Sequence, residues 1–233
     1  MRIIKKVFAA LFFLSIFNSG FCQGGAGLTY NIGEMMGRPF DVNNYENIKG
    51  TPYFIDSFTK VHIMVNNGAV YAIEKMRLNL LTHKLHFRAP DNTELVASDG
   101  IVKKVVFYKP SGDSAIPVIF SNGYPSIDKY NGLNYYEELS SGETRVLKLT
   151  EKVIANMRNI NASPLDKQFD EHTNIYLFST SQNKIVRWRK GKDFLLDFLN
   201  DKSAKVEKYI NTNHFDCRTI KDTILVIDYY NSL

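Results

Sequence analysis

The clearest secondary-structure signal of the chain is the segment Val61-His62-Ile63-Met64-Val65-Asn66-Asn67-Gly68-Ala69-Val70-Tyr71-Ala72-Ile73. Two runs rich in β-branched residues flank Asn66-Asn67-Gly68. A tight turn between antiparallel strands needs residues that tolerate positive φ, and Asn and Gly do so. The segment therefore predicts a β-hairpin, and the sequence on both sides continues the same pattern.

Four further pairs of short apolar runs surround turn residues. These pairs are 76–81 with 84–88, 93–97 with 101–108, 135–139 with 144–149, and 175–179 with 184–188. The run 115–120 contains Pro117, which cannot donate a ladder hydrogen bond and so predicts an edge strand. Short strands separated by regular turns are typical of antiparallel sheets. Residues 49–157 are therefore predicted to form an antiparallel β-meander, either a curved sheet or a small barrel.

Helical periodicity replaces the strand pattern near the C-terminus. Apolar residues recur at helical spacing in three sets, namely Phe194, Leu195, Phe198 and Leu199; Val206, Tyr209 and Ile210; and Ile220, Ile224, Leu225 and Ile227. Thr219 and Asp222 have the spacing of a helix N-cap and its third residue, although 224–227 would also suit a buried strand. The predicted fold class is α+β, with the antiparallel region followed by a short hairpin and a C-terminal helical cluster.

The first 22 residues have the pattern of a secretory signal peptide. Arg2, Lys5 and Lys6 precede an apolar run from Val7 to Phe17. The run is too short to span a membrane, which takes about 20 apolar residues, and no later segment is long and apolar enough. We therefore expect an exported protein that is periplasmic, associated with the outer membrane or extracellular, with no transmembrane helix in the mature chain.

The expected cleavage site lies between Cys22 and Gln23. Lipidation of Cys22 is the alternative, although Phe21 stands where a lipoprotein signal has a small residue. Cleavage after Cys22 leaves Cys217 as the single cysteine, so the mature fold would hold no intramolecular disulfide. Cys217 then has the properties of a small buried apolar residue rather than those of a nucleophile.

The composition is that of a globular protein and argues against bulk disorder, a collagen-like repeat and a disulfide scaffold. Of 233 residues, 44% are hydrophobic and 23% charged, which leaves enough apolar material for a core. The net charge of +5 comes from 29 basic and 24 acidic residues. Removing the leader takes away three basic residues and leaves a net charge of +2, so charge gives no reason to expect a nucleic-acid partner.

The mature chain divides into four parts by composition. Residues 23–48 are rich in glycine and predict a flexible lead-in. Residues 49–157 hold the predicted β region. Residues 158–173 are largely polar, contain Pro164 and predict a linker, and residues 174–233 hold the hairpin and the helices.

Two segments carry a resemblance to known proteins: Tyr45-Glu46-Asn47-Ile48-Lys49-Gly50-Thr51-Pro52-Tyr53 and Asp228-Tyr229-Tyr230-Asn231-Ser232-Leu233. Together with the hairpins between them, they resemble a family of exported Bacteroidota envelope proteins. The resemblance implies an envelope location and a layout of strands followed by helices. It implies no enzymatic activity and no catalytic residue.

The candidate binding residues are Arg187, Trp188 and Arg189. With Lys190 and Lys192 they form the densest basic run of the mature chain, and Trp188 is the single tryptophan. Two guanidinium groups could bind a phosphate or carboxylate, while the indole stacks on a ring or lies in a lipid interface. The alternative is a solvated edge strand with Trp188 packed under the following helix.

Tyrosines offer a second recognition surface. The mature chain contains Tyr30, Tyr45, Tyr124, Tyr130, Tyr135 and Tyr136. Exposed tyrosines suit sugar or protein recognition, whereas half-buried tyrosines on a curved sheet have the same sequence pattern.

No strong catalytic or metal motif is present: the chain has no G-x-S-x-G, H-E-x-x-H, P-loop, C-x-x-C or EF-hand sequence. His83 and His86 would point to opposite faces of a strand, which disfavours a shared metal ion. Asp170 and His172, in the acidic segment 166–172, would share one side if extended and could bind a cation, or could belong to a solvated linker. The sequence therefore assigns no catalytic residue, metal or cofactor.

These observations favour a non-enzymatic binding or structural module for an envelope protein, a polysaccharide or an anionic lipid. A hydrolase built around 166–172 is one alternative. A sensor that docks through its C-terminal helices is another, and it would leave Ile220, Ile224 and Ile227 exposed.

Overall fold

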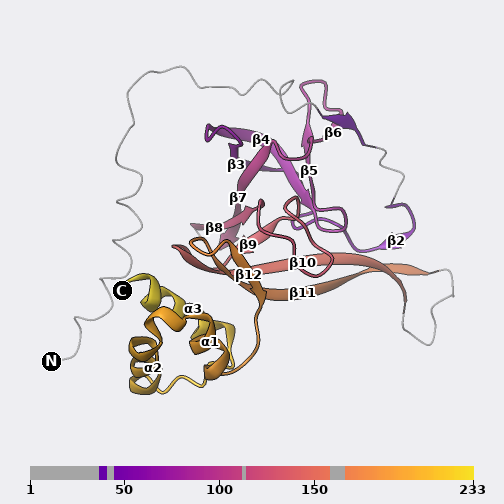
Figure 1. The fold of residues 1–233 in the computed structure, drawn as a ribbon. Helices are drawn as coiled ribbons and strands as arrows, with labels where there is room; N and C mark the ends of the chain where they lie inside the picture. The colour runs from indigo at the N-terminus through magenta and orange to yellow at the C-terminus, as the bar shows by residue number, and fades with distance from the viewer. Residues whose placement is uncertain (1–36, 41–44, 112–113, 158–165) are drawn as a thin grey trace.

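The computed structural model describes residues 37–40, 45–111, 114–157 and 166–233 (Figure 1). These residues form one sheet of 12 mostly antiparallel strands, which is followed by three α-helices. The predicted α+β class is confirmed at this level. The predicted signal peptide, residues 1–22, and most of the lead-in lie outside the described residues.

The strands are β1 Arg38–Pro39, β2 Ile48–Lys49, β3 Thr59–Val65, β4 Val70–Asn79, β5 Lys84–Arg88, β6 Glu94–Val96, β7 Val102–Ser111, β8 Ser114–Ser121, β9 Tyr136–Glu138, β10 Thr144–Asn156, β11 Lys167–Ser179 and β12 Lys184–Arg187. The helices are α1 Lys192–Phe198, the 3₁₀ turn η3 Asn200–Lys202, α2 Ser203–Thr212 and α3 Ile220–Asn231.

The sheet is open. Its strand order is β1-β6-β5-β4-β3-β7-β8-β9-β10-β11-β12, and β2 pairs in parallel with β11 beside this path. Since β1 and β12 end the order without meeting, the curved sheet fits and the small barrel does not.

Most predicted hairpins are confirmed by the strand pairs β3–β4, β4–β5, β9–β10 and β11–β12. The predicted pair 93–97 with 101–108 is wrong, because β6 pairs with β1 and β5 whereas β7 pairs with β3 and β8. Gly100, with φ +78°, does make a turn between β6 and β7. A turn signal fixes a change of chain direction, but it does not fix which strand becomes the neighbour.

Pro117 lies on an open stretch of β8, as predicted. It stands opposite Tyr108 of β7, while β9 reaches only Phe120 and Ser121. Asn122 donates its backbone N–H to Lys103 across the β7–β8 ladder. Because N–H groups alternate in direction along a strand, the nitrogen of Pro117 faces the open edge, where its missing proton discourages pairing with another strand.

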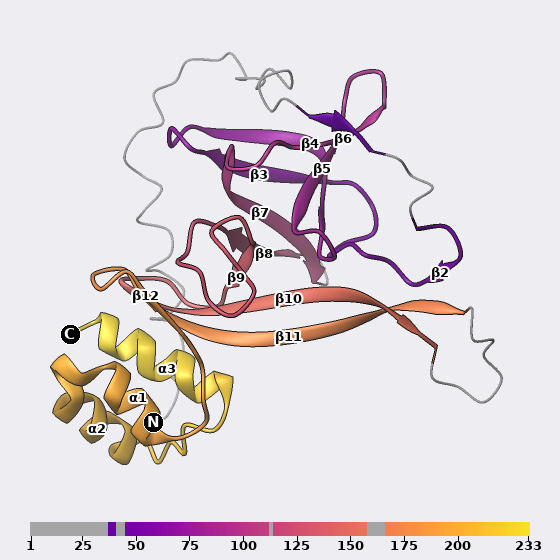
Figure 2. The same ribbon diagram turned by 45° about the vertical axis from the view of Figure 1, so that its right-hand side comes forward.

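The predicted linker 158–173 needs correction in its second half. Residues 158–165 lie outside the described residues, but Lys167–Thr173 form the first half of β11 and pair with β10 along its length. In Figure 2 this part of the β10–β11 ribbon extends beyond the rest of the sheet. Its residues are mostly exposed or half-buried, so their polar composition resembles that of a loop. The predicted lead-in 23–48 likewise contains the short strand β1 and the start of β2.

Three apolar clusters hold the described residues together. The first fills the curve of β3–β8 around Val61, Phe87 and Phe107. The second lies between the β10–β11 ribbon and the helices and includes the free, buried Cys217. The third lies under residues 122–135, which we call the cover loop, and includes Tyr136. Figure 2 shows the helices on one side of β10–β11 and the cover loop on the other.

The last helix is fixed at both ends. Thr219 caps α3 by accepting a hydrogen bond from the backbone N–H of Asp222 at 3.0 Å, which confirms the predicted helix start. At the other end, the side chain of Asn231 accepts from Thr144 N–H at 3.0 Å and donates to the carbonyl oxygens of Ser141 and Thr144 at 2.9 and 2.7 Å. Asn231 therefore clamps the helix onto the β9–β10 turn.

We expect Asn231→Ala to lower the free energy of unfolding by roughly 2–3 kcal/mol, since it removes these bonds and leaves partly buried backbone groups unpaired. Urea denaturation followed by circular dichroism measures the change. The control is Ser232→Ala, which removes one exposed bond to Tyr229 and should change the stability by less than about 0.5 kcal/mol. Equal midpoints for the two variants would contradict the clamp.

Candidate functional site

The side chains of Arg187, Trp188 and Arg189 contact three different partners. The Arg187 guanidinium lies 3.0 Å from a carboxylate oxygen of Asp128. The Trp188 indole N–H donates to the hydroxyl of Thr223 at 3.0 Å, and the ring packs against the helical core. The guanidinium carbon of Arg189 lies 5.4 Å from the centre of the Phe194 ring, which is a third partner.

The tyrosines of residues 124–136 are core residues. Tyr124, Tyr130, Tyr135 and Tyr136 are all buried. Tyr124 contacts the rings of Tyr136 and Phe178, with ring centres 5.3 and 4.9 Å apart. These tyrosines fasten the cover loop to the sheet, so the recognition surface expected from them is absent in this part of the described chain.

Most of the acidic segment 166–172 lies in the first half of strand β11. Gln168 donates to the Asp170 carboxylate at 2.8 Å, and Glu171 and His172 are exposed. Within the described ranges, no group of three or more His, Cys, Asp or Glu side chains is placed to hold a metal ion.

His83 and His86 have separate surroundings. His83 occupies the β4–β5 turn with φ +53°, and its ring lies 6.4 Å from that of Tyr130. The Nδ1 atom of His86 lies 2.7 Å from Glu94 Oε1. His83 is thus a residue of the β4–β5 turn and His86 a residue of strand β5.

His86 belongs to a buried charge cluster that the sequence analysis missed. Arg77 Nη2 lies 2.8 Å from both carboxylate oxygens of Glu94. The guanidinium also stacks on Tyr53 and Phe58, at 3.6 and 4.3 Å from the ring centres. Burial raises the pKa of Glu94, but hydrogen bonds from His86 and Arg77 outweigh it, so the net pKa lies below the ordinary value of 4.5. These groups bond to one another under aromatic side chains, although Arg77 Nε has no hydrogen-bond partner among the described residues, so the cluster serves the fold.

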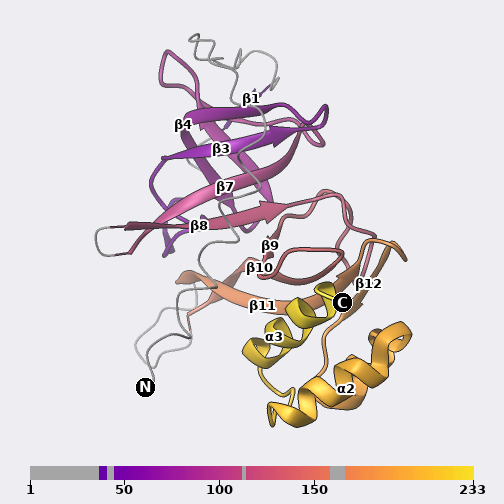
Figure 3. The same cartoon turned by 90° about the vertical axis from the view of Figure 1, so that its left-hand side faces the viewer.

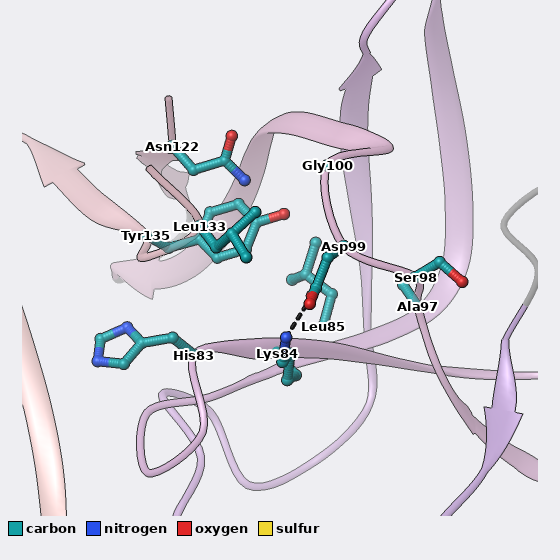
Figure 4. Close-up of a pocket in the computed structure, with 10 residues that line it drawn as sticks. All are labelled: His83, Lys84, Leu85, Ala97, Ser98, Asp99, Gly100, Asn122, Leu133 and Tyr135. Carbon is teal, nitrogen blue, oxygen red and sulfur yellow. Dashed lines mark hydrogen bonds and ion pairs between the residues drawn. The ribbon is translucent and has the colours of Figure 1, made fainter. Parts of the chain in front are cut away.

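Figure 4 shows a small pocket between the β4–β5 turn and the cover loop. It is lined by His83, Lys84, Leu85, Ala97, Ser98, Asp99, Gly100, Asn122, Leu133 and Tyr135. Its volume of about 10 Å³ is room for about one water molecule. Lys84 pairs with Asp99, and the His83 ring turns away from that pair (Figure 4). The pocket is therefore too small for a substrate.

Apolar side chains also lie on one side of four adjacent strands, β4, β3, β7 and β8, which are side by side in Figure 3. Register places Ala72 opposite His62, His62 opposite Val106, and Val106 opposite Ile119. Cross-strand partners point to the same side of a sheet, so these four residues form one row. Its flanking residues are Met64 and Val70 on one side and Tyr108 and Pro117 on the other. We call these eight residues the outer face.

The outer face is exposed where a solvated sheet surface is usually polar. Val70 is 60% and Tyr108 37% exposed; Ala72 and Pro117 are also exposed, and the remaining four are half-buried. The sequence signal was apolar residues on both sides of β3, since Val61, Ile63 and Val65 fill the core while Met64 points outward.

Polar groups on and beside the outer face pair with one another. His62 Nδ1 lies 2.8 Å from the Tyr108 hydroxyl. At the margins, Lys60 pairs with Glu74 at 2.7 Å and Lys104 with Glu138 at 3.2 Å. Apart from the His62–Tyr108 pair, the surface is thus apolar, and it is electrically neutral at these margins.

The predicted apolar stripe of the last helix is part of the core. Ile227 is buried, and Ile220 and Ile224 pack against the second apolar cluster. The docking stripe required by the sensor hypothesis is therefore occupied by the protein's own core. None of the helices among the described residues has the length and apolar character needed to cross a membrane.

Comparison with known proteins finds no match to a family model, a curated protein or a solved structure.

Proposed function

We propose that this protein is an exported, non-enzymatic binding module of the cell envelope and that its partner is another protein. The observation that carries the proposal is the outer face, a mainly apolar set of eight residues on four strands, four of which are exposed and four half-buried among the described residues. Contiguous apolar surface of this kind marks interaction sites in soluble proteins. The export and envelope location rest on the leader pattern of residues 1–22 and on the resemblance to exported envelope proteins.

The chemistry of the outer face favours a protein over a glycan or an anionic lipid. A glycan needs hydrogen-bonding groups, but His62 and Tyr108 already bond to each other. An anionic lipid surface attracts unpaired basic side chains, whereas Lys60 and Lys104 each have an acidic partner. An apolar protein surface would satisfy the face by excluding water from both partners.

We expect Ala72→Glu to weaken partner binding at least about tenfold, because a carboxylate placed in the apolar row would lose its water without gaining a partner. The purified mature protein is immobilised and the amount of solubilised envelope protein that it retains is titrated. Ala204→Glu is the matched control, since Ala204 is also exposed but lies on α2.

A photo-crosslinker attached at Val70→Cys identifies what lies on the face, with Ala204→Cys as its control. The proposal expects a crosslinked protein at position 70 only, whose retention is weakened by Ala72→Glu. Retention that is equal for Ala72→Glu and Ala204→Glu would refute it. Loss of retention in Arg187→Ala/Arg189→Ala alone would move the binding site to the basic run instead.

A further inference from the structure

His83 is a buried imidazole without a hydrogen-bond partner. It is only 8% exposed, and neither ring nitrogen has a partner among the described residues. The backbone at His83 lies in the left-handed region, with φ +53°. A buried polar group without a partner is uncommon in native structures and calls for an explanation.

The centre of the His83 ring lies 6.4 Å from that of Tyr130, whose hydroxyl attaches the cover loop to β10. Glu151 of β10 accepts hydrogen bonds from Lys129 at 2.7 Å and from the Tyr130 hydroxyl at 2.6 Å. The charges of both Glu151 and Lys129 act on His83. The other charged groups beside it are Lys84 and Asp99, which pair with each other.

We propose that His83 is an acid-responsive latch that holds the tip of the cover loop, residues 127–130, on β10 and releases it on protonation. A proton taken up from solvent would turn the ring into a cation beside Glu151. The imidazolium would compete with Lys129 and Tyr130 for that carboxylate and would repel Lys129. The loop tip would then lose the two bonds that tie it to β10.

Release would expose surface that adjoins the outer face. Lys104 stands opposite Ser121, and Ser121 stands opposite Tyr136, so these three side chains share one side of the sheet. The outer face lies on this side of β7 and β8, and the apolar cluster beneath the cover loop continues it toward β10. Acid would therefore enlarge the apolar surface available to a partner. The latch itself does not depend on the proposed function.

The direction and size of the effect follow from linkage. Burial lowers the pKa of His83 from 6.5 to about 4; Glu151 opposes the shift and Lys129 adds to it. A released loop would return the ring toward its ordinary pKa, so the open form binds the proton more tightly. With these values the open population rises roughly 20-fold between pH 7 and pH 5.

Hydrogen–deuterium exchange tests the latch in the full mature chain at pH 7, 6 and 5, with rates corrected for intrinsic exchange. We expect protection of residues 127–130 to fall roughly 20-fold at pH 5 while the β3–β4 hairpin keeps its protection. His83→Asn should abolish the pH response, because Asn does not titrate and tolerates the left-handed backbone. A response that persists in His83→Asn would overturn the latch, as would unchanged protection or equal loss throughout the chain.

A second measurement covers failure of the variant to fold. Imidazole NMR of the natural chain follows the protonation of His83 directly. The latch requires protection at 127–130 to fall between pH 6.5 and the protonation midpoint that the NMR titration gives, and to level off below that midpoint. Protection that stays constant over this range would refute it.

Discussion

Glu94→Ala should lower the free energy of unfolding by about 3–5 kcal/mol, the loss typical of breaking a buried ion pair by removing one partner. Glu94 is 4% exposed and joins β6 to Arg77 of β4 and His86 of β5. Its removal leaves the Arg77 guanidinium with no carboxylate opposite Nη2. The buried cation would then have to draw in water or swing out of its stack on Tyr53.

The same carboxylate contributes an acid-labile part of the stability. The pKa of Glu94 is lower in the folded protein than its ordinary 4.5, so the unfolded chain binds the proton more tightly. Its contribution is fully present above pH 4.5 and is lost as the pH falls through the folded-state pKa. The Glu94→Ala variant should lack this loss below pH 4.5, whereas the natural chain should show it.

Glu74→Ala is the matched control for Glu94→Ala. Glu74 is also in the sheet and also pairs with a basic residue, Lys60, but both side chains are more than half exposed. An exposed pair contributes less than about 1 kcal/mol, so this variant should unfold almost as the natural chain does. Urea denaturation at pH 7 and at pH 4 measures both variants. Similar losses for Glu94→Ala and Glu74→Ala would show that the cluster contributes no more than a surface pair.

Local turn chemistry made the hairpins predictable from sequence. Asn67-Gly68 and Ser141-Gly142 stand between apolar runs, and both turns lie where the pattern places them. The Glu94 cluster could not be predicted in this way, because Arg77, His86 and Glu94 meet only when β4, β5 and β6 lie side by side. No local pattern fixes that juxtaposition, just as none revealed that β7 pairs with β3.

Two features could not be predicted from the sequence pattern, for opposite reasons: the strand character of Lys167–Thr173 and the position of the outer face. Lys167–Thr173 appear polar because a ribbon that extends beyond the core need not alternate, so its strand character was hidden. The outer face was hidden by its own apolar residues, because Met64 and Val106 strengthen a strand prediction without showing which side they occupy. Register supplied that information, since it puts both on the side away from the first apolar cluster.

Trp188→Ala should lower the free energy of unfolding by about 3 kcal/mol, because deleting a large aromatic side chain from a packed site leaves a cavity. The indole sits between β12 and α3, where it packs against the helical core and donates to Thr223. Trp188→Phe should recover most of the loss, since it restores the ring but not the N–H. The remaining loss should be about 1 kcal/mol.

Comparison with Arg187→Ala separates the two interpretations of the basic run. The Arg187 side chain is 53% exposed and its partner Asp128 is 38% exposed, so removing the pair should change stability by less than about 1 kcal/mol. Guanidinium denaturation followed by far-UV circular dichroism measures all three variants, since fluorescence is lost with the single tryptophan. If Trp188 served a ligand rather than the core, Trp188→Ala would unfold at the same midpoint as Arg187→Ala. The geometry instead predicts a clear separation, because the indole joins the helices to the sheet.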